Sequence, residues 1–281
     1  MLDAALDLLR CPHCGASLAR HGGTVRCAAG HSFDVARQGY LSLLPGDARL
    51  GSADTASMVL ARERFLVAGH FDPLAGALAA EAERALVGGA PEGCVLEPGA
   101  GTGWYLARVM ERLPGRLGLA LDISKPALRR AARAHERIAA VGADVWGRLP
   151  IRDGVAALAL SVFAPRNAAE LARVLRPGGA LVVASPTDRH LADLVRALGL
   201  LGVGQRKREA LATKLDPHLG PPRTATLEWT FELSRADALD AAGMGPSAWH
   251  ADRADRADAV GRLGEPVTVT GSVDISVRRR P

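Results

Sequence analysis

Four side chains near the start of the chain have the types and spacing of a metal site. Cys11 and Cys14 are separated by two residues, and Cys27 and His31 by three, which gives the pattern Cys-x2-Cys-x12-Cys-x3-His. Three thiolates and one imidazole match the preference of Zn²⁺ for four sulfur and nitrogen ligands in a tetrahedron. A closed set of four ligands indicates a structural ion rather than a catalytic one. The spacing therefore predicts a small zinc-binding module.

The ligand set of this module has alternatives. His13 or Asp34 could take the fourth position instead of His31, since both lie close to the same cysteines in the sequence. A disulfide is a further alternative, which fits poorly with a reducing cytoplasm. The remaining cysteine, Cys94, lies far away within an apolar run and is predicted to be a small buried side chain.

A second candidate site is a glycine-rich turn that follows an apolar run. Residues 95–107 read Val-Leu-Glu-Pro-Gly-Ala-Gly-Thr-Gly-Trp-Tyr-Leu-Ala, and the apolar residues continue at helical spacing to Leu113. This order predicts a strand, a tight turn and a helix whose unpaired N–H groups face a ligand. Glycines let the backbone approach that ligand closely. A dinucleotide fingerprint would need its third glycine at position 104, which is Trp104, so the dehydrogenase interpretation weakens.

Two acidic residues end later apolar runs. Asp122 follows the run 117–121, about 20 residues after the turn, where a carboxylate can accept both hydroxyl groups of a ribose. Asp144 lies near the end of the run 139–145, where it is predicted to accept a hydrogen bond from an adenine amino group, with Val145 beside the ring. A loop cap is an equally good explanation for Asp144 taken alone.

The elements that must position these groups form an α/β pattern. The apolar runs alternate with helical patterns and are predicted to form a doubly wound sheet. Segments 224–233 and 267–277 alternate like strands, with Ser234 capping a helix between them, and are predicted to complete a seven-stranded sheet as an antiparallel pair. The predicted parts are a zinc module, a helical linker and a core domain, at residues 1–45, 46–90 and 91–281.

Within the linker, two helices are predicted from their start signals. Asp54 is expected to cap a helix from 55 to 68. Asp72 is expected to cap a second helix, with Pro73 in its first turn, that reaches about Val87. The apolar faces of both helices predict packing against the rest of the protein.

The glycine turn resembles a motif of a known enzyme class. Its pattern Glu-x-Gly-x-Gly-x-Gly resembles motif I of the class I S-adenosylmethionine-dependent methyltransferases, and residues 174–184 resemble the Leu-x-Pro-Gly-Gly turn before their fifth strand. The resemblance implies a Rossmann-like methyltransferase fold that binds S-adenosyl-L-methionine. The cofactor contacts that it implies are Glu97, Gly99, Gly101, Gly103, Tyr105, Asp122, Asp144 and Val145.

The N-terminal segments narrow this resemblance. Cys-Pro-His-Cys, the Cys-x-x-x-His pair, residues 33–40 (Phe-Asp-Val-Ala-Arg-Gln-Gly-Tyr) and residues 58–70 occur in the same order in the 23S rRNA (guanine-N1)-methyltransferases of the RlmA type. These include the actinomycete enzymes that confer resistance to tylosin- and mycinamicin-type macrolides. The resemblance covers nearly the whole chain. It implies methylation of guanine N1 in a 23S rRNA hairpin loop near the peptide exit tunnel, with nucleotide 748 favoured over 745, and leaves a homodimer open.

The segment after the expected fourth strand lies where this enzyme class meets its acceptor. Residues 161–167 contain no Cys for attack on a pyrimidine C5 and no Asn/Asp-Pro-Pro-Tyr/Phe motif of exocyclic-amine methylases. Phe163 is expected to stack on the guanine and Arg166 to stabilise negative charge on its O6. For Phe163 a core position is an equal alternative. No residue of this segment is a convincing general base. Water is therefore expected to remove the N1 proton, with Asp144 as the candidate side chain.

Charge and composition add a weaker indication of the partner. The net charge of +5 and the sequence pI of about 9.4 suit a polyanionic partner. No apolar run approaches the roughly 18 residues of a membrane span, and the first residues lack a signal-peptide pattern. We therefore expect a cytoplasmic protein that does not enter a membrane.

Several basic and aromatic side chains are weaker candidates for contact with RNA or with the acceptor base. The candidates are Arg62, Arg64, Arg189, His190, the cluster 205–208, Trp249 and His250. Solvation, capping or packing would explain each of them equally well. Residues 278–280, three arginines, are predicted to be a frayed tail.

Two other functions remain open at this point. A methyltransferase acting on a small molecule would share the glycine turn and Asp122, but would have little use for a zinc module. A non-catalytic zinc protein that binds RNA would keep the module and lose the cofactor site. Binding of S-adenosylmethionine separates the second alternative from both enzymes, and methyl transfer to rRNA separates the two enzymes.

Overall fold

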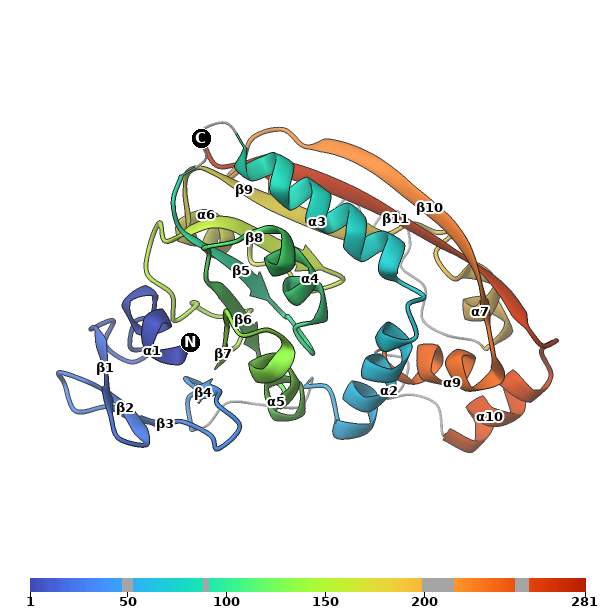
Figure 1. Cartoon of the computed structure of the whole chain (residues 1–281), viewed down its shortest axis with the longest axis horizontal. Coiled ribbons are helices and arrows are strands. Elements are labelled where there is room, and N and C mark those ends of the chain that lie inside the picture. The colour runs from blue at the N-terminus through green and yellow to red at the C-terminus, as the bar shows by residue number, and fades with distance from the viewer. Residues whose placement is uncertain (47–52, 88–90, 199–214, 246–252) are drawn as a thin grey trace.

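The N-terminal module is small and mostly extended (Figure 1, blue). In the computed structural model, which describes residues 1–46, 53–87, 91–198, 215–245 and 253–281, it begins with the short helices α1 (Leu2–Ala5) and η1 (Leu6–Leu8). An antiparallel sheet of three strands follows, β1 (Leu18–His21), β2 (Thr24–Cys27) and β3 (Ser32–Asp34). Gly22 has a φ of 59° in the turn between β1 and β2, a conformation that glycine adopts without steric cost.

Within the described residues, the main sheet has eight strands in the order β10-β11-β9-β8-β5-β6-β7-β4. Strands β4 to β9 pair in parallel, and β11 joins β9 and β10 antiparallel, as expected for the last two strands. Their bounds are β4 Leu41–Ser42, β5 Cys94–Pro98, β6 Gly118–Asp122, β7 Ile138–Gly142, β8 Ala156–Val162, β9 Leu175–Pro186, β10 Arg223–Leu233 and β11 Val267–Arg279.

Seven of these strands, β5 to β11, belong to the core domain, as predicted, and the eighth comes from the N-terminal part of the chain. The additional strand is β4, which pairs Leu41 with Val141 and Ser42 with Gly142 at the outer edge of β7. The Leu43 N–H also donates to the Gly142 carbonyl at 2.9 Å. A two-residue strand gives almost no sequence signal, but it covers backbone groups that the edge strand β7 would otherwise expose.

Helices cover both faces of this sheet (Figure 1). They are α2 Ala56–Val67, α3 Asp72–Leu86, α4 Trp104–Arg112, α5 Lys125–Ala134, α6 Ala168–Val174, α7 Ala192–Ala197, α9 Arg235–Gly243 and α10 Arg253–Gly261. Ser234 caps α9 as predicted, accepting from the Asp237 N–H at 3.2 Å. Two other start signals are off by one residue. Thr55 rather than Asp54 caps α2, and Asp72 is the first residue of α3 rather than its cap.

Alternate residues of the strands supply two separate cores. On one face, Val95, Leu158 and Val182 pack with Leu74 of α3 and Leu106 of α4. On the other face, the neighbouring strand residues pack with α6 and the N-terminal module. This second core includes Leu96, Leu119, Leu121 and Leu181 of the strands, Leu171 of α6, and Leu2, Leu9 and Leu41. The zinc module thus buries its apolar side chains against the same sheet that carries the glycine turn. The division at residues 1–45, 46–90 and 91–281 stays a prediction, because packing crosses each boundary.

The C-terminal arginines are ordered parts of the sheet, so their prediction as a frayed tail is wrong. Arg278 is 3% exposed and donates to Asp216 at 2.7 Å and to the Gly220 carbonyl at 3.1 Å. Arg279 donates to the Ala85 carbonyl at 3.0 Å, and Arg280 to Leu175. The long antiparallel pairing of β11 with β9 and β10 brings these residues to their partners, which no local pattern indicates.

Cys94 is buried at the start of β5, as expected for a small apolar side chain, and burial raises the pKa of its thiol to about 12. Across the described stretches of the chain, none of the helices is long and apolar enough to span a bilayer.

Candidate functional site

The four predicted metal ligands converge on one point of the N-terminal module. The ligand atoms of Cys11, Cys14, Cys27 and His31 all lie within 4.8 Å of one another. The Sγ atoms of Cys14 and Cys27 are 3.7 Å apart, and His31 Nδ1 lies 3.3 Å and 3.6 Å from the Sγ atoms of Cys27 and Cys11. A tetrahedral Zn²⁺ with Zn–S bonds of about 2.3 Å requires neighbouring sulfurs about 3.8 Å apart. The arrangement fits this ion, and the zinc assignment is confirmed.

The structure selects His31 over its two rivals as the fourth ligand. Neither His13 nor Asp34 belongs to the cluster. The His13 ring stacks on Phe33 at 5.9 Å between centroids and lies 4.9 Å from the ring of His31. His13 therefore packs beside the ligand rather than replacing it, which the spacing alone could not decide.

Backbone hydrogen bonds join the metal module to the core. The Arg10 N–H donates to the Pro150 carbonyl at 3.0 Å, and the Arg152 N–H donates to the Leu8 carbonyl at 2.9 Å. Leu9 and Ile151 form an isolated antiparallel bridge between them. Because Arg10 directly precedes the first metal ligand, the orientation of the zinc cluster is fixed relative to the sheet.

The glycine turn between β5 and α4 has the geometry that its sequence predicts. Gly99 and Gly101 have φ values of 73° and 55°, which other residues rarely adopt. A Cβ at Gly99 would lie 2.9 Å from the Ala164 Cβ, so a side chain there would displace the loop after β8. Asp122, at the end of β6, accepts from the Gly101 N–H and the Ser124 N–H, each at 2.8 Å. One carboxylate therefore ties the turn to the neighbouring strand.

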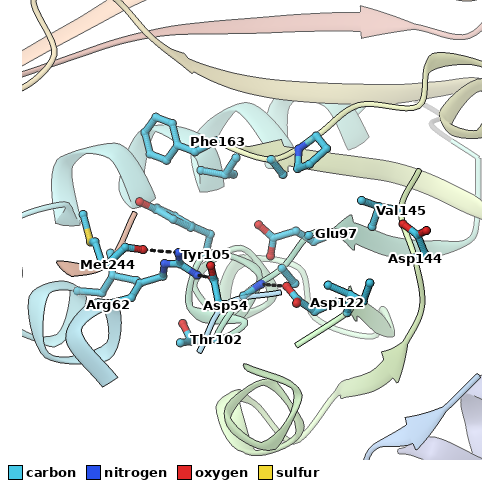
Figure 2. Close-up of a pocket in the computed structure, with 18 of the residues that line it drawn as sticks. Asp54, Arg62, Glu97, Thr102, Tyr105, Asp122, Asp144, Val145, Phe163 and Met244 are labelled. Atoms are coloured by element: carbon cyan, nitrogen blue, oxygen red, sulfur yellow. Dashed lines mark hydrogen bonds and ion pairs between the residues drawn. The ribbon is translucent and has the colours of Figure 1, made fainter. Parts of the chain in front are cut away.

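A cavity of about 300 Å³ lies over this turn (Figure 2). Seven of the eight predicted cofactor residues line the cavity: Glu97, Gly99, Gly101, Tyr105, Asp122, Asp144 and Val145. Gly103 does not line it. Gly103 lies at the start of α4 with a φ of 74°, and a Cβ there would lie 3.1 Å from Ala131 of α5. Its role is close helix packing.

Glu97 is a deeply buried acid in the wall of the cavity. It is 1% exposed, and its Oε2 has no hydrogen-bond partner among the residues that the structure describes. Burial, with a smaller contribution from the Asp122 carboxylate, raises the pKa of Glu97 to about 8. Burial likewise raises the pKa values of Asp122 and Tyr105. An orphaned buried oxygen beside a glycine cradle fits a ligand with a hydrogen-bond donor or a positive charge, as the amino-acid part of S-adenosylmethionine has.

The side of the cavity formed by the loop after β7 carries Asp144 and Val145, with Ile123 from the loop after β6. Asp144 is exposed, and its Oδ1 accepts from the Trp146 N–H at 2.9 Å. The loop cap that the sequence left open is thus present, together with the predicted position in the cavity wall. The same loop brings Trp146 to the rim, where 62% of this residue is exposed.

Phe163 lies at the opposite side, beside the Tyr105 ring (Figure 2). It is 40% exposed, which excludes the alternative of a core aromatic, and its φ of 53° is unusual for a residue with a bulky side chain. Its ring centroid is 5.5 Å from that of His190 and 6.3 Å from that of Phe71. Strained backbone that surrounding packing maintains is typical of functional positions.

Arg166 was expected beside the acceptor base, but it is not among the residues that line the cavity. Its guanidinium donates to Ser185 Oγ at 2.7 Å and to Ser161 Oγ at 3.3 Å. Burial lowers the pKa of Arg166. The Arg166 side chain therefore joins the ends of β8 and β9.

The weaker RNA candidates are mostly engaged within the protein. Arg64 donates to both carboxylate oxygens of Asp240, at 2.7 Å from Nε, and Arg189 pairs with Glu228 at 2.9 Å. His190 accepts from the Ser272 N–H at 3.2 Å through Nδ1, and burial lowers the pKa of His190 to about 4. His190 is therefore neutral and packs in the aromatic cluster. Trp249, His250 and the cluster 205–208 lie outside the described residues.

The linker supplies a part of the cavity wall that was not predicted from the sequence. Asp54, Arg62, Leu66 and Phe71, from the α2 region, form one wall with Met244, which follows α9. Arg62 was expected to be solvated or to contact phosphate, but it pairs with Asp54 and donates to the Met244 carbonyl at 2.6 Å. Nothing local indicates this position, because it depends on how α2 packs between α5 and α9.

Two family models match the chain at the parts just described. The N-terminal zinc ribbon of RlmA matches residues 9–49, and a methyltransferase domain matches residues 95–179.

Curated relatives match almost the full length. The chain is 51% identical to the 23S rRNA (guanine(748)-N(1))-methyltransferase of Streptomyces fradiae, over 96% of both chains. It is 49% identical, over 98% of both chains, to a protein of Micromonospora griseorubida provisionally named 23S rRNA (guanine-N(1)-)-methyltransferase. A Bacillus subtilis protein that carries the same provisional name is 28% identical over 96% of both chains.

Proposed function

Because the chain belongs to the 23S rRNA (guanine-N1)-methyltransferase family, we propose that it methylates N1 of guanine 748 in a hairpin loop of 23S rRNA. The Streptomyces fradiae relative, half of whose residues are identical, is named for this nucleotide. Guanine 745 is the second candidate. The proposed substrate hairpin lies near the peptide exit tunnel, and the proposed reaction takes place in the cytoplasm.

The acceptor atom sets the requirements for the cavity. Guanine N1 lies on the Watson–Crick edge, so the base must leave its pair or come from an open loop before it can react. Extruded bases are held by stacking on aromatic side chains. Among the Phe, Tyr and Trp residues that the structure describes, the two exposed ones, Trp146 and Phe163, both line the cavity. This coincidence is the observation that best supports a planar base as the substrate.

Each part of the cavity has a proposed task in the reaction. S-adenosylmethionine supplies a methyl group that its sulfonium already activates. Asp122 accepts from the ribose hydroxyls, while Asp144 and Val145 hold the adenine. Phe163 stacks on the guanine so that N1 meets the methyl group in line, and alignment of this kind contributes much of the rate of a transfer reaction. The Ala164 carbonyl is proposed to accept a hydrogen bond from the guanine.

The N1 proton has no dedicated acceptor in this scheme. Asp144 lies on the Val145 side of the cavity, while Phe163 lies on the Tyr105 side (Figure 2). We propose that water removes the proton, with Asp144 as the alternative, and that Arg166 acts through the positions of β8 and β9 rather than on O6. The proposed reaction is the same for a monomer and for a homodimer.

Primer extension on 23S rRNA tests the proposed target, because a methyl group on N1 blocks base pairing and halts the polymerase. Incubation of the purified protein with S-adenosylmethionine and 23S rRNA is expected to produce a stop next to nucleotide 748. The Asp122→Ala variant is the matched control and should give no stop. A stop next to nucleotide 745 would make guanine 745 the target instead of guanine 748. Unmodified 23S rRNA would contradict the proposed function.

Competing acceptors separate the remaining alternative, a small-molecule methyltransferase. Transfer of a labelled methyl group to tRNA or to small acceptors, in the absence of transfer to 23S rRNA, would favour it. If guanine 748 is the target, expression of the chain in a sensitive bacterium is expected to raise its tolerance of tylosin-type macrolides, and the Asp122→Ala variant should not.

A further inference from the structure

The charges that line the cavity are unequal in number. Four acidic residues contribute to its walls, Asp54, Glu97, Asp122 and Asp144. Within the portions of the chain that the structure describes, Arg62 is the one basic residue among the lining side chains. A ligand that fits this distribution carries more positive than negative charge and presents its negative group toward Arg62.

Arg62 is held directly above the glycine turn. A Cβ at Gly101 would lie 3.2 Å from Arg62 Nη1, so the guanidinium occupies the space left free by the missing side chain. Its Nη2 donates to the Met244 carbonyl at 2.6 Å, and its Nη1 donates to Asp54 (Figure 2). Only 24% of its side chain is exposed. Two of the five N–H groups of the guanidinium have these partners, which leaves others for a ligand.

The segment that carries Arg62 is anchored to the ribose side of the site. Ser124 Oγ donates to the Asp54 carbonyl at 2.7 Å, and the Ser124 N–H donates to Asp122. Arg62 and Leu66 are one helical turn apart on α2, and both line the cavity. Helix α2 is further tied to α5 by Arg130, whose Nε lies 2.9 Å from both carboxylate oxygens of Glu63. The linker helix is thus a fixed wall of the cofactor site.

We propose that Arg62 binds the α-carboxylate of S-adenosylmethionine and that Asp54 positions the guanidinium for this contact. The cofactor carries a positive sulfonium, a positive ammonium and one negative carboxylate. Arg62 is the matching charge for the carboxylate at the end of the cavity where the glycine turn lies. The inference depends on the cofactor of the family and not on which RNA nucleotide is methylated.

Decarboxylated S-adenosylmethionine provides the decisive comparison, because it keeps the sulfonium, the ammonium and the adenosine and lacks only the carboxylate. Calorimetry on the full chain is expected to show that Arg62→Met weakens binding of S-adenosylmethionine roughly 10- to 100-fold, the range for a lost hydrogen bond between charged groups. Binding of the decarboxylated analogue should change less than about threefold, because that ligand makes no such bond. Arg62→Lys should recover part of the lost affinity.

Asp54→Asn is the matched control, because it breaks the same ion pair while keeping Arg62. This variant should still prefer the complete cofactor over the decarboxylated analogue. Equal weakening of both ligands by Arg62→Met would show a structural role and overturn the proposal. Unchanged cofactor binding with weaker RNA binding would overturn it too, and would assign Arg62 to an RNA phosphate. Thermal unfolding of each variant without ligand identifies any loss of folding.

Discussion

Glu97 shows how burial sets the charge of a single side chain. Its pKa of about 8 means that most of the carboxyl groups are protonated at neutral pH in the ligand-free protein. Because the folded-state pKa lies above the ordinary value of 4.5, protonated Glu97 stabilises the folded protein. This stabilisation is complete below about pH 4.5 and is lost as the pH rises through about 8. A positive group beside the carboxyl would reverse the balance by favouring its ionised form.

This linkage predicts the pH dependence of cofactor binding. The affinity for S-adenosylmethionine should rise between about pH 6.5 and 8.5 and then level off, because the cationic cofactor binds the ionised form of Glu97. Glu97→Gln should bind more weakly at pH 8.5 and show a much flatter profile. Calorimetry across this range in matched buffers measures both, and a wild-type profile as flat as that of the variant would contradict the prediction.

Phe163 combines an exposed ring with a strained backbone, and the two can be tested separately. Phe163→Ala is expected to lower kcat/KM for rRNA roughly 5- to 100-fold, since stacking on one base is worth about 1–3 kcal/mol. Its affinity for the cofactor should stay nearly unchanged. Phe163→Gly relieves the positive φ but also lacks the ring, so it should show the same loss for rRNA. Recovery of activity in Phe163→Gly would mean that backbone conformation, not stacking, is what matters.

Strand β4 illustrates how a very short element can join two parts of a protein. Its Leu41 is fully buried in the core that the module, the sheet and α6 share. The strand also extends the main sheet at the edge of β7. Both contacts are lost if the module separates from the core.

Leu41→Ala tests this connection. The free energy of unfolding is expected to fall by about 2–5 kcal/mol, the usual cost of removing a large buried apolar side chain. Leu60→Ala, at a position that is 41% exposed on α2, should change it by less than about 1 kcal/mol. Denaturant unfolding measured both by tryptophan fluorescence and by circular dichroism provides the values. A similar small effect for both variants would show that β4 contributes little to the core.

The whole molecule is organised as one sheet with a different supporting layer on each face. Helices α2, α3 and α4 complete the cofactor side, while α6 and the zinc module cover the other side. The metal ion is far from the glycine turn in sequence, but the module that it folds is part of the support of the sheet. Stability of the core is therefore expected to depend on the metal.

Removal of zinc tests this dependence. A strong chelator should unfold the N-terminal module, because its four ligands hold together a segment with few apolar contacts of its own. The melting temperature of the remaining protein should fall as well, since β4 and Leu9 lose their positions. Zinc release measured by a colorimetric indicator and differential scanning calorimetry give the two quantities. Cys11→Ser should reproduce the effect, and stoichiometric zinc in that variant would contradict the ligand set.

Features that depend on residues close together in the chain were predictable from the sequence. The spacing of Cys11, Cys14, Cys27 and His31 predicted the metal, because two short turns fix the directions of paired ligands. The glycine turn and Asp122 were equally readable, because a strand, a turn and a helix in succession leave few alternatives for the backbone. The alternation of the last two strands likewise gave their antiparallel pairing.

Contacts between residues far apart in the sequence became visible in the folded structure alone. The wall formed by Asp54, Arg62 and Met244, the eighth strand β4 and the burial of Arg278 all join segments with no local signal for one another. The same holds for Arg166. Its positive charge suggested that it binds an anion, but in the fold it donates hydrogen bonds to Ser161 and Ser185. Local patterns specify what a side chain is able to bind, whereas the packing of whole elements determines which partner lies within its reach.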